Sequence, residues 1–258
     1  MLKIVLIGAG NVGSHLGEIL VKKNQEVVQV FSRKTQKAKR LAKKLNTTHT
    51  NKLDQINPYA DLYILAVSDA SIELVASSLS KIPLSQKALV VHTSGATPST
   101  VFKPYFKQYG IFYPLQTFSV SRKSNFNNIP ICIHANRKPL RQRLEKLAQL
   151  LSPKVYLIDD QQRAILHVAA VFVNNFANHL FQIGETILEK ENLSFEILKP
   201  LIQETAEKIK NHPAKKMQTG PAIRDDQNTI EKHLDFLNEY PAFQDLYQQL
   251  TNSIQQNK

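Results

Sequence analysis

The chain has 258 residues, 42% of them hydrophobic, and 33 lysines and arginines against 21 acidic residues give a formal net charge of +12. This length allows one large or two modest domains with substantial cores. A single cysteine, Cys132, excludes an internal disulfide and fits a reducing cytoplasm, where we expect the protein to work. The positive charge makes nucleic acid a candidate partner, but the sequence has no zinc motif or helix-turn-helix pattern, so we do not expect nucleic-acid binding.

A membrane span is not expected from the sequence. The chain opens on a strand pattern rather than on a signal peptide, and it has no uncharged apolar run of about 18 residues. The most apolar stretch, 164–183, is interrupted by side chains that a bilayer core penalises, namely His167, Asn174, Asn175, Asn178 and His179. We therefore predict no membrane partner.

The first predicted elements are a strand over 4–7, a tight glycine turn and a helix. In this context the pattern Gly-x-Gly-x-x-Gly is typical of dinucleotide binding. The first glycine makes the turn, the second lets the backbone approach a pyrophosphate, and the third lets the helix pack on the strand. The positive helix start faces the phosphates. The predicted cofactor-binding residues are Gly8, Gly10, Asn11, Val12 and Gly13. The alternative is a glycine-rich turn in another α/β protein.

The second predicted strand, 27–31, indicates which dinucleotide is bound. An NAD-binding protein usually has a carboxylate at the end of this strand to accept from the ribose hydroxyls. Here Ser32 and Arg33 follow instead, and they suit the 2′-phosphate of NADP. We therefore predict NADP(H). The alternative is that Arg33 only belongs to the solvated start of a helix.

Further strands and helices alternate through the first half of the chain. Helices are predicted over about 35–45, from 69 toward 79, and over 140–151, and strands near 47–50 and over 62–67, 88–92, 111–113, 129–134 and 155–158. From 159 onward only long helical patterns occur, over roughly 160–190, 194–211 and 227–254. The predicted fold is α/β, with a Rossmann-type, doubly wound parallel sheet in residues 1–158 and an all-α domain in 159–258.

Polar residues follow two of the central strands. Val67 and Ser68 end one strand, and Thr93 and Ser94 follow the next. Ligands of open α/β sheets bind at the carboxyl ends of the strands, so these four residues are predicted to contact the nicotinamide half of the cofactor. Ordinary strand-to-helix loop residues are the alternative.

The apolar helical pattern 163–188 contains polar residues at helical spacing. With the period of an α-helix, His167, Asn174 and Asn178 point in nearly the same direction, together with Glu185. Such a stripe needs partners, either in a substrate cleft or in the core of a dimer or domain. In a cleft, His167 would be the proton donor, Asn174 would orient a carbonyl or imine, and Asn178 would position the substrate or His167. We predict His167 and Asn174 as catalytic residues.

Two loops add candidate substrate contacts. Gln116 lies among polar groups that follow the strand 111–113, and Arg224 lies in a turn beside Asp225 and Asp226. Arg224 could clamp a substrate carboxylate, or it could pair with either neighbouring aspartate and fix the loop.

Four ordered motifs carry a family resemblance: 92–95, 114–119, His167 with Asn174-Asn175, and Gly220-Pro221 with Arg224 and Asp226. They resemble the bacterial Rossmann-like proteins with a C-terminal DUF2520 domain. These proteins are similar to F420-dependent NADP oxidoreductases, pyrroline-5-carboxylate reductase and the β-hydroxyacid dehydrogenases. The resemblance implies an NADP-binding domain, a helical domain that commonly dimerises, and an active cleft between them.

The chain departs from these families at a few positions. Tyr113 stands where His often precedes Pro-Leu-Gln, Asp225 stands where Gly is common, and 160–189 lacks the catalytic lysine of the β-hydroxyacid dehydrogenases. We predict a homodimeric NADP(H)-dependent oxidoreductase that acts on a small carbonyl/alcohol or imine/amine metabolite in an interdomain cleft. The alternative is a non-catalytic NADP(H)-binding sensor or scaffold. No metal site is predicted, because the histidines lack ligand spacing.

Overall fold

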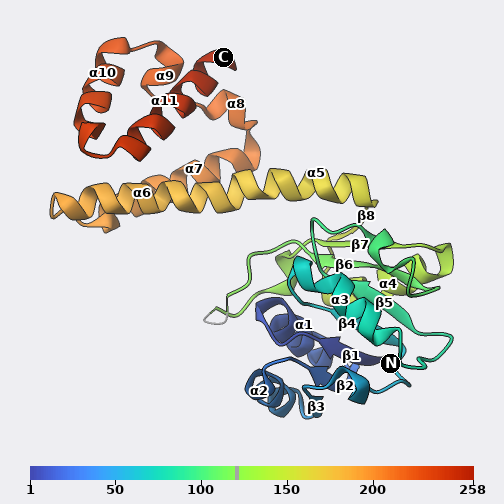
Figure 1. Ribbon diagram of the computed structural model, residues 1–258. Coiled ribbons are helices and arrows are strands. Elements are labelled where there is room, and N and C mark those ends of the chain that lie inside the picture. The colour runs from blue at the N-terminus through green and yellow to red at the C-terminus, as the bar shows by residue number, and fades with distance from the viewer. Residues whose placement is uncertain (120–121) are drawn as a thin grey trace. The chain divides into compact units, whose positions relative to one another are not determined.

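The computed structural model describes residues 1–119 and 122–258 (Figure 1). The chain forms two compact units, Met1–Asn174 and Asn175–Lys258. The first unit contains the whole sheet, and the second is helical. The division between the units falls inside a long helix, whereas the boundary after residue 158 remains a prediction.

The first unit is built on one eight-stranded sheet with the order β3-β2-β1-β4-β5-β6-β7-β8. All neighbouring strands are parallel except β6 and β7, which are antiparallel. The order reverses between β1 and β4, as in a Rossmann-type fold, and the α/β prediction is confirmed. The strands are β1 Lys3–Ile7, β2 Glu26–Phe31, β3 Thr48–Thr50, β4 Leu62–Leu65, β5 Leu89–His92, β6 Tyr109–Pro114, β7 Ile131–Ala135 and β8 Val155–Leu157.

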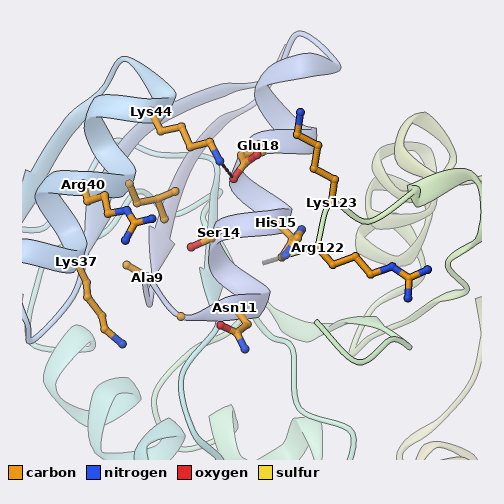
Figure 2. Close-up of a pocket in the computed structure, with 12 residues that line it drawn as sticks. Ala9, Asn11, Ser14, His15, Glu18, Lys37, Arg40, Lys44, Arg122 and Lys123 are labelled. Atoms are coloured by element: carbon orange, nitrogen blue, oxygen red, sulfur yellow. Dashed lines mark hydrogen bonds and ion pairs between the residues drawn. The ribbon is translucent and has the colours of Figure 1, made fainter. Parts of the chain in front are cut away.

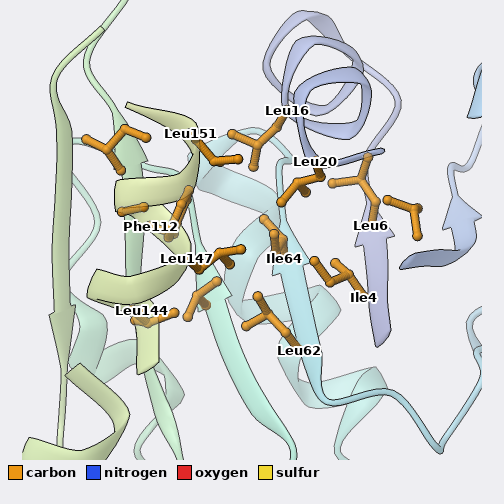
Figure 3. Close-up of a cluster of buried hydrophobic side chains, with 14 of the residues drawn as sticks. Ile4, Leu6, Leu16, Leu20, Leu62, Ile64, Phe112, Leu144, Leu147 and Leu151 are labelled. Carbon is orange, nitrogen blue, oxygen red and sulfur yellow. The ribbon is translucent and has the colours of Figure 1, made fainter. Parts of the chain in front are cut away.

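Helices cover both faces of this sheet. They are α1 Asn11–Lys22, α2 Thr35–Leu45, α3 Asp69–Leu79 and α4 Lys138–Leu151, with short 3₁₀ turns at Leu53–Gln55, Ser99–Phe102 and Phe126–Asn128. Alternate residues of β1 enter opposite cores: Ile4 and Leu6 pack with α1, α2 and α4, whereas Val5 and Ile7 pack with α3. This burial on both faces is the reason that the strand reads as a continuous apolar run. Figure 3 shows the first of these cores, where Leu147 of α4 faces the same strands.

A 31-residue helix runs from Asp160 to Lys190. It consists of α5 Asp160–Ala170, a π-helical segment Val171–Phe176, and α6 Ala177–Lys190. By length and composition this helix could cross a membrane, and the described residues of the chain do not bury its most apolar window. The predicted alignment of the polar stripe assumed one uniform α period. That assumption is wrong, because the π turn, with its i→i+5 bonds, changes the phase between His167 and Asn178.

The second unit continues with shorter helices. They are the 3₁₀ turn Phe195–Leu198, α7 Lys199–Asn211, α8 Ala214–Met217, α9 Pro221–Arg224, α10 Gln227–Phe236, the 3₁₀ turn Leu237–Glu239 and α11 Pro241–Gln256. The prediction of one helix over 227–254 is wrong. Proline has no N–H to continue a helix and clashes with the preceding turn, so Pro241 starts a new helix instead.

Candidate functional site

The glycine turn between β1 and α1 has the geometry that a dinucleotide requires. Gly8 has a φ of +118°, and a Cβ there would lie 2.2 Å from the Ala66 carbonyl oxygen. A Cβ on Gly13 would lie 2.1 Å from the Gly8 oxygen, so α1 approaches the turn as closely as a backbone can. Among the described residues, no atom lies within 4 Å of a Cβ built on Gly10, which leaves that backbone open to a ligand. Asn11 begins α1, so the positive helix end lies at the same point.

A basic cavity with an empty volume of about 840 Å³ opens beside this turn (Figure 2). Its walls come from the start of α1, from α2 and from the loop that follows β6. The cationic side chains among its lining residues are Lys37, Arg40, Lys44, Arg122 and Lys123. Glu18 is the carboxylate in this lining, and it accepts a 2.5 Å hydrogen bond from Lys44. The cavity therefore suits an anionic ligand.

The loop after β6 is fastened to α1 at this cavity. The Asn11 side chain donates to the Phe118 carbonyl (2.9 Å), and the His15 ring contacts the Ser119 carbonyl (2.9 Å). The rings of His15 and Phe118 also lie 5.1 Å apart. Asn11 thus contributes its side chain to loop placement as well as its backbone to the helix start.

The predicted NADP-selecting residues lie at the end of β2, next to α2. Ser32 is half-buried and its hydroxyl accepts from the Lys34 N–H, at 3.4 Å. Arg33 is exposed and is absent from the cavity lining, which instead contains Lys37 and Arg40 from the following helix. On this side of the cavity the lining cations therefore come from α2 and not from Arg33.

The residues after β4 and β5 form the carboxyl edge of the central strands. Val67 and Ser68 precede α3, and the Ser68 hydroxyl lies 2.8 Å from that of Ser71. Thr93 and Ser94 are both buried. The Ser94 hydroxyl accepts from the N–H groups of residues 96 and 97 and thereby fixes the loop.

At this edge His167 contacts Tyr113 of β6 and lies against Gly95 of the loop after β5. Its Nδ1 lies 3.5 Å from the Tyr113 hydroxyl, and the two rings are edge to face. Gly95 lies against both, because a Cβ there would be 2.5 Å from His167 Nδ1 and 2.9 Å from Tyr113 Cζ. β5 and β6 are neighbours in the sheet, so the loop after β5 and the end of β6 reach the same place. Burial raises the pKa of the Tyr113 phenol above its ordinary value.

An ion pair between half-buried Asp160 and a buried arginine, Arg163, anchors the helix that carries His167. Arg163 is fully buried; its guanidinium donates to Asp160 (2.7 Å) and to the Thr97 carbonyl. Asp160 also accepts from the backbone and hydroxyl of Ser99 (2.9 and 2.8 Å). Burial opposes ionisation of Asp160, but the hydrogen bonds from Ser99 and Arg163 outweigh it and hold the pKa of this carboxyl below its ordinary value. The start of α5 is thus fixed to the loop after β5.

His92 lies beneath the same loop and is neutral. Its Nδ1 accepts from the Ser94 N–H (3.2 Å), so Nε2 carries the hydrogen and donates to the Pro98 carbonyl (3.4 Å). Burial, reinforced by the Arg163 charge, lowers the pKa of His92 to about 4. His92 therefore supports the loop as an uncharged group.

Comparison with known proteins assigns the two halves of the chain. Residues 1–116 match the Rossmann-like domain, and residues 129–254 match the domain of unknown function DUF2520. A solved structure from Bacteroides fragilis, named as an NADP oxidoreductase, is 42% identical, with a TM-score of 0.94 over 99% of this chain and 98% of that one.

The chain belongs to the Rossmann-like DUF2520 family.

More distant structures share the fold of this DUF2520 protein. A pyrroline-5-carboxylate reductase from Coxiella burnetii is 16% identical, with a TM-score of 0.62 over 100% of this chain and 98% of that one. An imine reductase from Myxococcus stipitatus, solved with NADP⁺, is 13% identical, with a TM-score of 0.66 over 98% and 92%. No curated protein matches the chain.

Other predicted site residues of the DUF2520 protein lie outside these contacts. Gln116 is exposed and its side chain accepts from the Thr117 N–H (2.8 Å). Asn174 is exposed at the end of the first unit. Asn178 and Arg224 are exposed residues of the second unit. Their roles remain predictions.

The neighbours predicted for Arg224 have other partners. Asp226 caps α10: its carboxylate accepts from the Thr229 N–H (3.1 Å) and from the Thr229 hydroxyl (2.8 Å). These hydrogen bonds lower the pKa of Asp226 most, and the charge of Arg224 makes a smaller contribution in the same direction. Asp225 forms an ion pair with Lys258.

Sequence reasoning did not select Tyr113, Gly95 and Arg163 as site residues. Tyr113 and Gly95 belong to the segments 113–119 and 92–95, which follow predicted strands, but their contact with His167 joins parts of the chain that are far apart in sequence. The spacing of Asp160 and Arg163 by three residues on a predicted helix was the one local signal for the ion pair.

Proposed function

We propose that this DUF2520 protein is an NADP(H)-dependent oxidoreductase for a small carbonyl/alcohol or imine/amine substrate. The observation that carries the proposal is the glycine turn, where Gly10 is open while Gly8 and Gly13 allow no side chain. The 42% identical Bacteroides fragilis protein, named as an NADP oxidoreductase, supports the same class of activity.

The choice of NADP(H) over NAD(H) follows from the charges around the turn. The cavity beside it presents Lys37 and Arg40, and its carboxylate, Glu18, is already paired with Lys44. Arg33 stands where NAD-binding proteins usually place a carboxylate. A cation that binds the 2′-phosphate through a charge-assisted hydrogen bond contributes about 1.5–3 kcal/mol, roughly a tenfold to hundredfold difference in affinity.

When bound, the nicotinamide supplies the hydride. His167 is the proton donor of the proposal: it lies beside the loop after β5, and it gives a proton to the oxygen or nitrogen of the double bond that accepts the hydride. Two hydrogen bonds hold that loop in place: the Thr93 hydroxyl donates to the Leu65 carbonyl, and the Ser94 hydroxyl accepts from the N–H of residue 97. Asn174 is proposed to orient the carbonyl or imine, and this role rests on the sequence alone.

Calorimetric titration with NADPH and NADH tests the cofactor. We expect tighter binding of NADPH, weaker binding of both nucleotides by Gly10→Ala, and a loss confined to NADPH in Arg40→Ala and Arg33→Ala. Lys103→Ala is a matched control for charge, because Lys103 is exposed and lies outside the cavity lining. Equal affinities for the two nucleotides would remove the NADP assignment.

Absorbance at 340 nm tests the reaction, with NADPH and panels of small ketones, aldehydes and cyclic imines. We expect oxidation with at least one class, and its loss in His167→Asn. A tight NADPH complex that turns over no member of the panels would favour the sensor instead.

We also propose a homodimer formed through the long helix. Several of its apolar side chains are exposed in the part of the chain that the structure describes; among them are Ile165, Val168, Val173, Leu180 and Phe181. Polar residues along the same helix, including His179 and Glu185, are costly in a bilayer but acceptable in a protein interface. A two-fold axis lets one face cover its own copy.

Sedimentation equilibrium tests the dimer. Val173 is 78% exposed and Leu74 of α3 is 68% exposed, so charges at both positions should be tolerated by the monomer. We expect Val173→Arg to be monomeric and Leu74→Arg to remain dimeric. A monomeric wild-type protein, or one that cosediments with lipid vesicles, would contradict the proposal.

A further inference from the structure

The contact between Tyr113 and His167 is held from three sides. Tyr113 lies on β6, where it is paired with Cys132 of β7. His167 lies one turn after Arg163, which is tied to the Thr97 carbonyl. Gly95 closes the third side, since even a methyl group there would overlap the His167 ring. The ring of His167 therefore has its Nδ1 side fixed against the sheet.

The hydrogen in this contact belongs to the tyrosine. A hydroxyl can donate or accept, whereas each nitrogen of a neutral imidazole does only one of the two. The lone pair of an imidazole nitrogen is a better acceptor than the phenol oxygen, whose lone pairs are delocalised into the ring. Burial raises the pKa of Tyr113, so the hydroxyl keeps its hydrogen through the neutral pH range. Tyr113 then donates to Nδ1, over 3.5 Å in this structure.

We propose that Tyr113 is a positioning residue that keeps neutral His167 in its Nε2–H tautomer. Nε2 lies on the side of the ring opposite Tyr113 and Gly95. The ring then presents a hydrogen-bond donor to a carbonyl oxygen or imine nitrogen even when it is uncharged. When the ring is protonated, rotation of the Tyr113 hydroxyl lets it accept from Nδ1–H, so the orientation is kept. The functional meaning rests on the proposed reaction, but the tautomer itself does not.

The test is NMR of protein labelled with ¹⁵N-histidine, recorded without nucleotide at a pH where the ring is neutral. The couplings between ring nitrogens and carbon-bound hydrogens show which nitrogen carries the proton. His167→Gln identifies the His167 signals among the eight histidines by their loss. We expect the wild-type protein to show His167 almost entirely as the Nε2–H form.

Two variants should disturb this state by different routes. Tyr113→Phe removes the hydroxyl but keeps the ring, and Gly95→Ala inserts a methyl group between the two residues. Both should turn the single tautomer into a mixture. Tyr109→Phe is the matched control, because Tyr109 is a buried tyrosine on the same strand, β6, and it should leave the His167 signals unchanged.

The outcomes are distinct. A wild-type His167 in the Nδ1–H form or as an even mixture overturns the proposal, and so does an unchanged tautomer in a folded Tyr113→Phe protein. If Tyr113→Phe does not fold, Gly95→Ala decides in the same way. The proposed function fails separately, through absent NADPH binding in the calorimetric titration, and that result would leave the tautomer measurement intact.

Discussion

Substitution of Gly13 by alanine tests whether α1 really packs on the glycine turn without room for a side chain. The new Cβ would lie 2.1 Å from the Gly8 oxygen and 3.0 Å from the Gly8 carbon. Both are backbone atoms, and Leu16 and Leu20 on the same helix are fully buried, so the strain cannot be relieved by a side-chain rotation. The helix must move away from the sheet or tilt.

The size of the effect follows from two opposing contributions. Overpacking costs about 1–3 kcal/mol, and a Cβ only 2.1 Å from a backbone oxygen places Gly13→Ala in the upper part of this range, at about 2–3 kcal/mol. Alanine gains about 1 kcal/mol over glycine within a helix. We expect a net loss of about 1–2 kcal/mol in the free energy of unfolding, and a melting temperature lower by roughly 2–8 °C for a unit of this size.

Gly184 of α6 is the matched control for this measurement. A Cβ there would meet only Leu198 and Phe195 side chains, at 3.7 and 3.9 Å, which is ordinary contact. Gly184→Ala should therefore stabilise the protein by about 0.5–1 kcal/mol through helix propensity alone. Thermal unfolding followed by circular dichroism measures both variants. A Gly13→Ala protein that melts at or above the wild-type temperature would refute the packing argument.

Three further predictions concern buried groups. Burial lowers the pKa of His92 to about 4, below the value of about 6.5 in the unfolded chain, so its contribution to stability is complete above pH 6.5 and is lost as the pH falls toward 4. Urea unfolding at pH 5 should therefore show a free energy of unfolding about 2 kcal/mol lower than at neutral pH, and His92→Asn should lack this decrease. Burial raises the pKa of Cys132 to about 11, so iodoacetamide should label it only when urea unfolds the chain, and fast labelling of native protein would contradict its placement. Arg163→Leu leaves Asp160 without its buried partner and should cost about 3 kcal/mol by urea unfolding, whereas a neutral effect would show that the pair is dispensable.

The amino-acid sequence by itself determined the features that depend on neighbours in the chain. The turn at Gly8 was predictable because only glycine takes its backbone angle, and the strand at 4–7 was predictable because burial on both faces demands a continuous apolar run. Cys132 is likewise buried within an apolar segment of its strand, β7.

Tertiary structure decided the features that join distant residues. Tyr113 and His167 are 54 positions apart. They meet because Asp160 and Arg163 fix α5 to the loop after β5, and β5 lies beside β6, which carries Tyr113. Arg163 is buried because the loop after β5 offers it a carbonyl, which no helical pattern reveals. The π segment Val171–Phe176 changed the phase of the polar stripe, since the sequence alone suggested a uniform α period. Local conformation depends on residues that are close in sequence, whereas the partners of a buried polar group depend on which distant residues the fold places beside it.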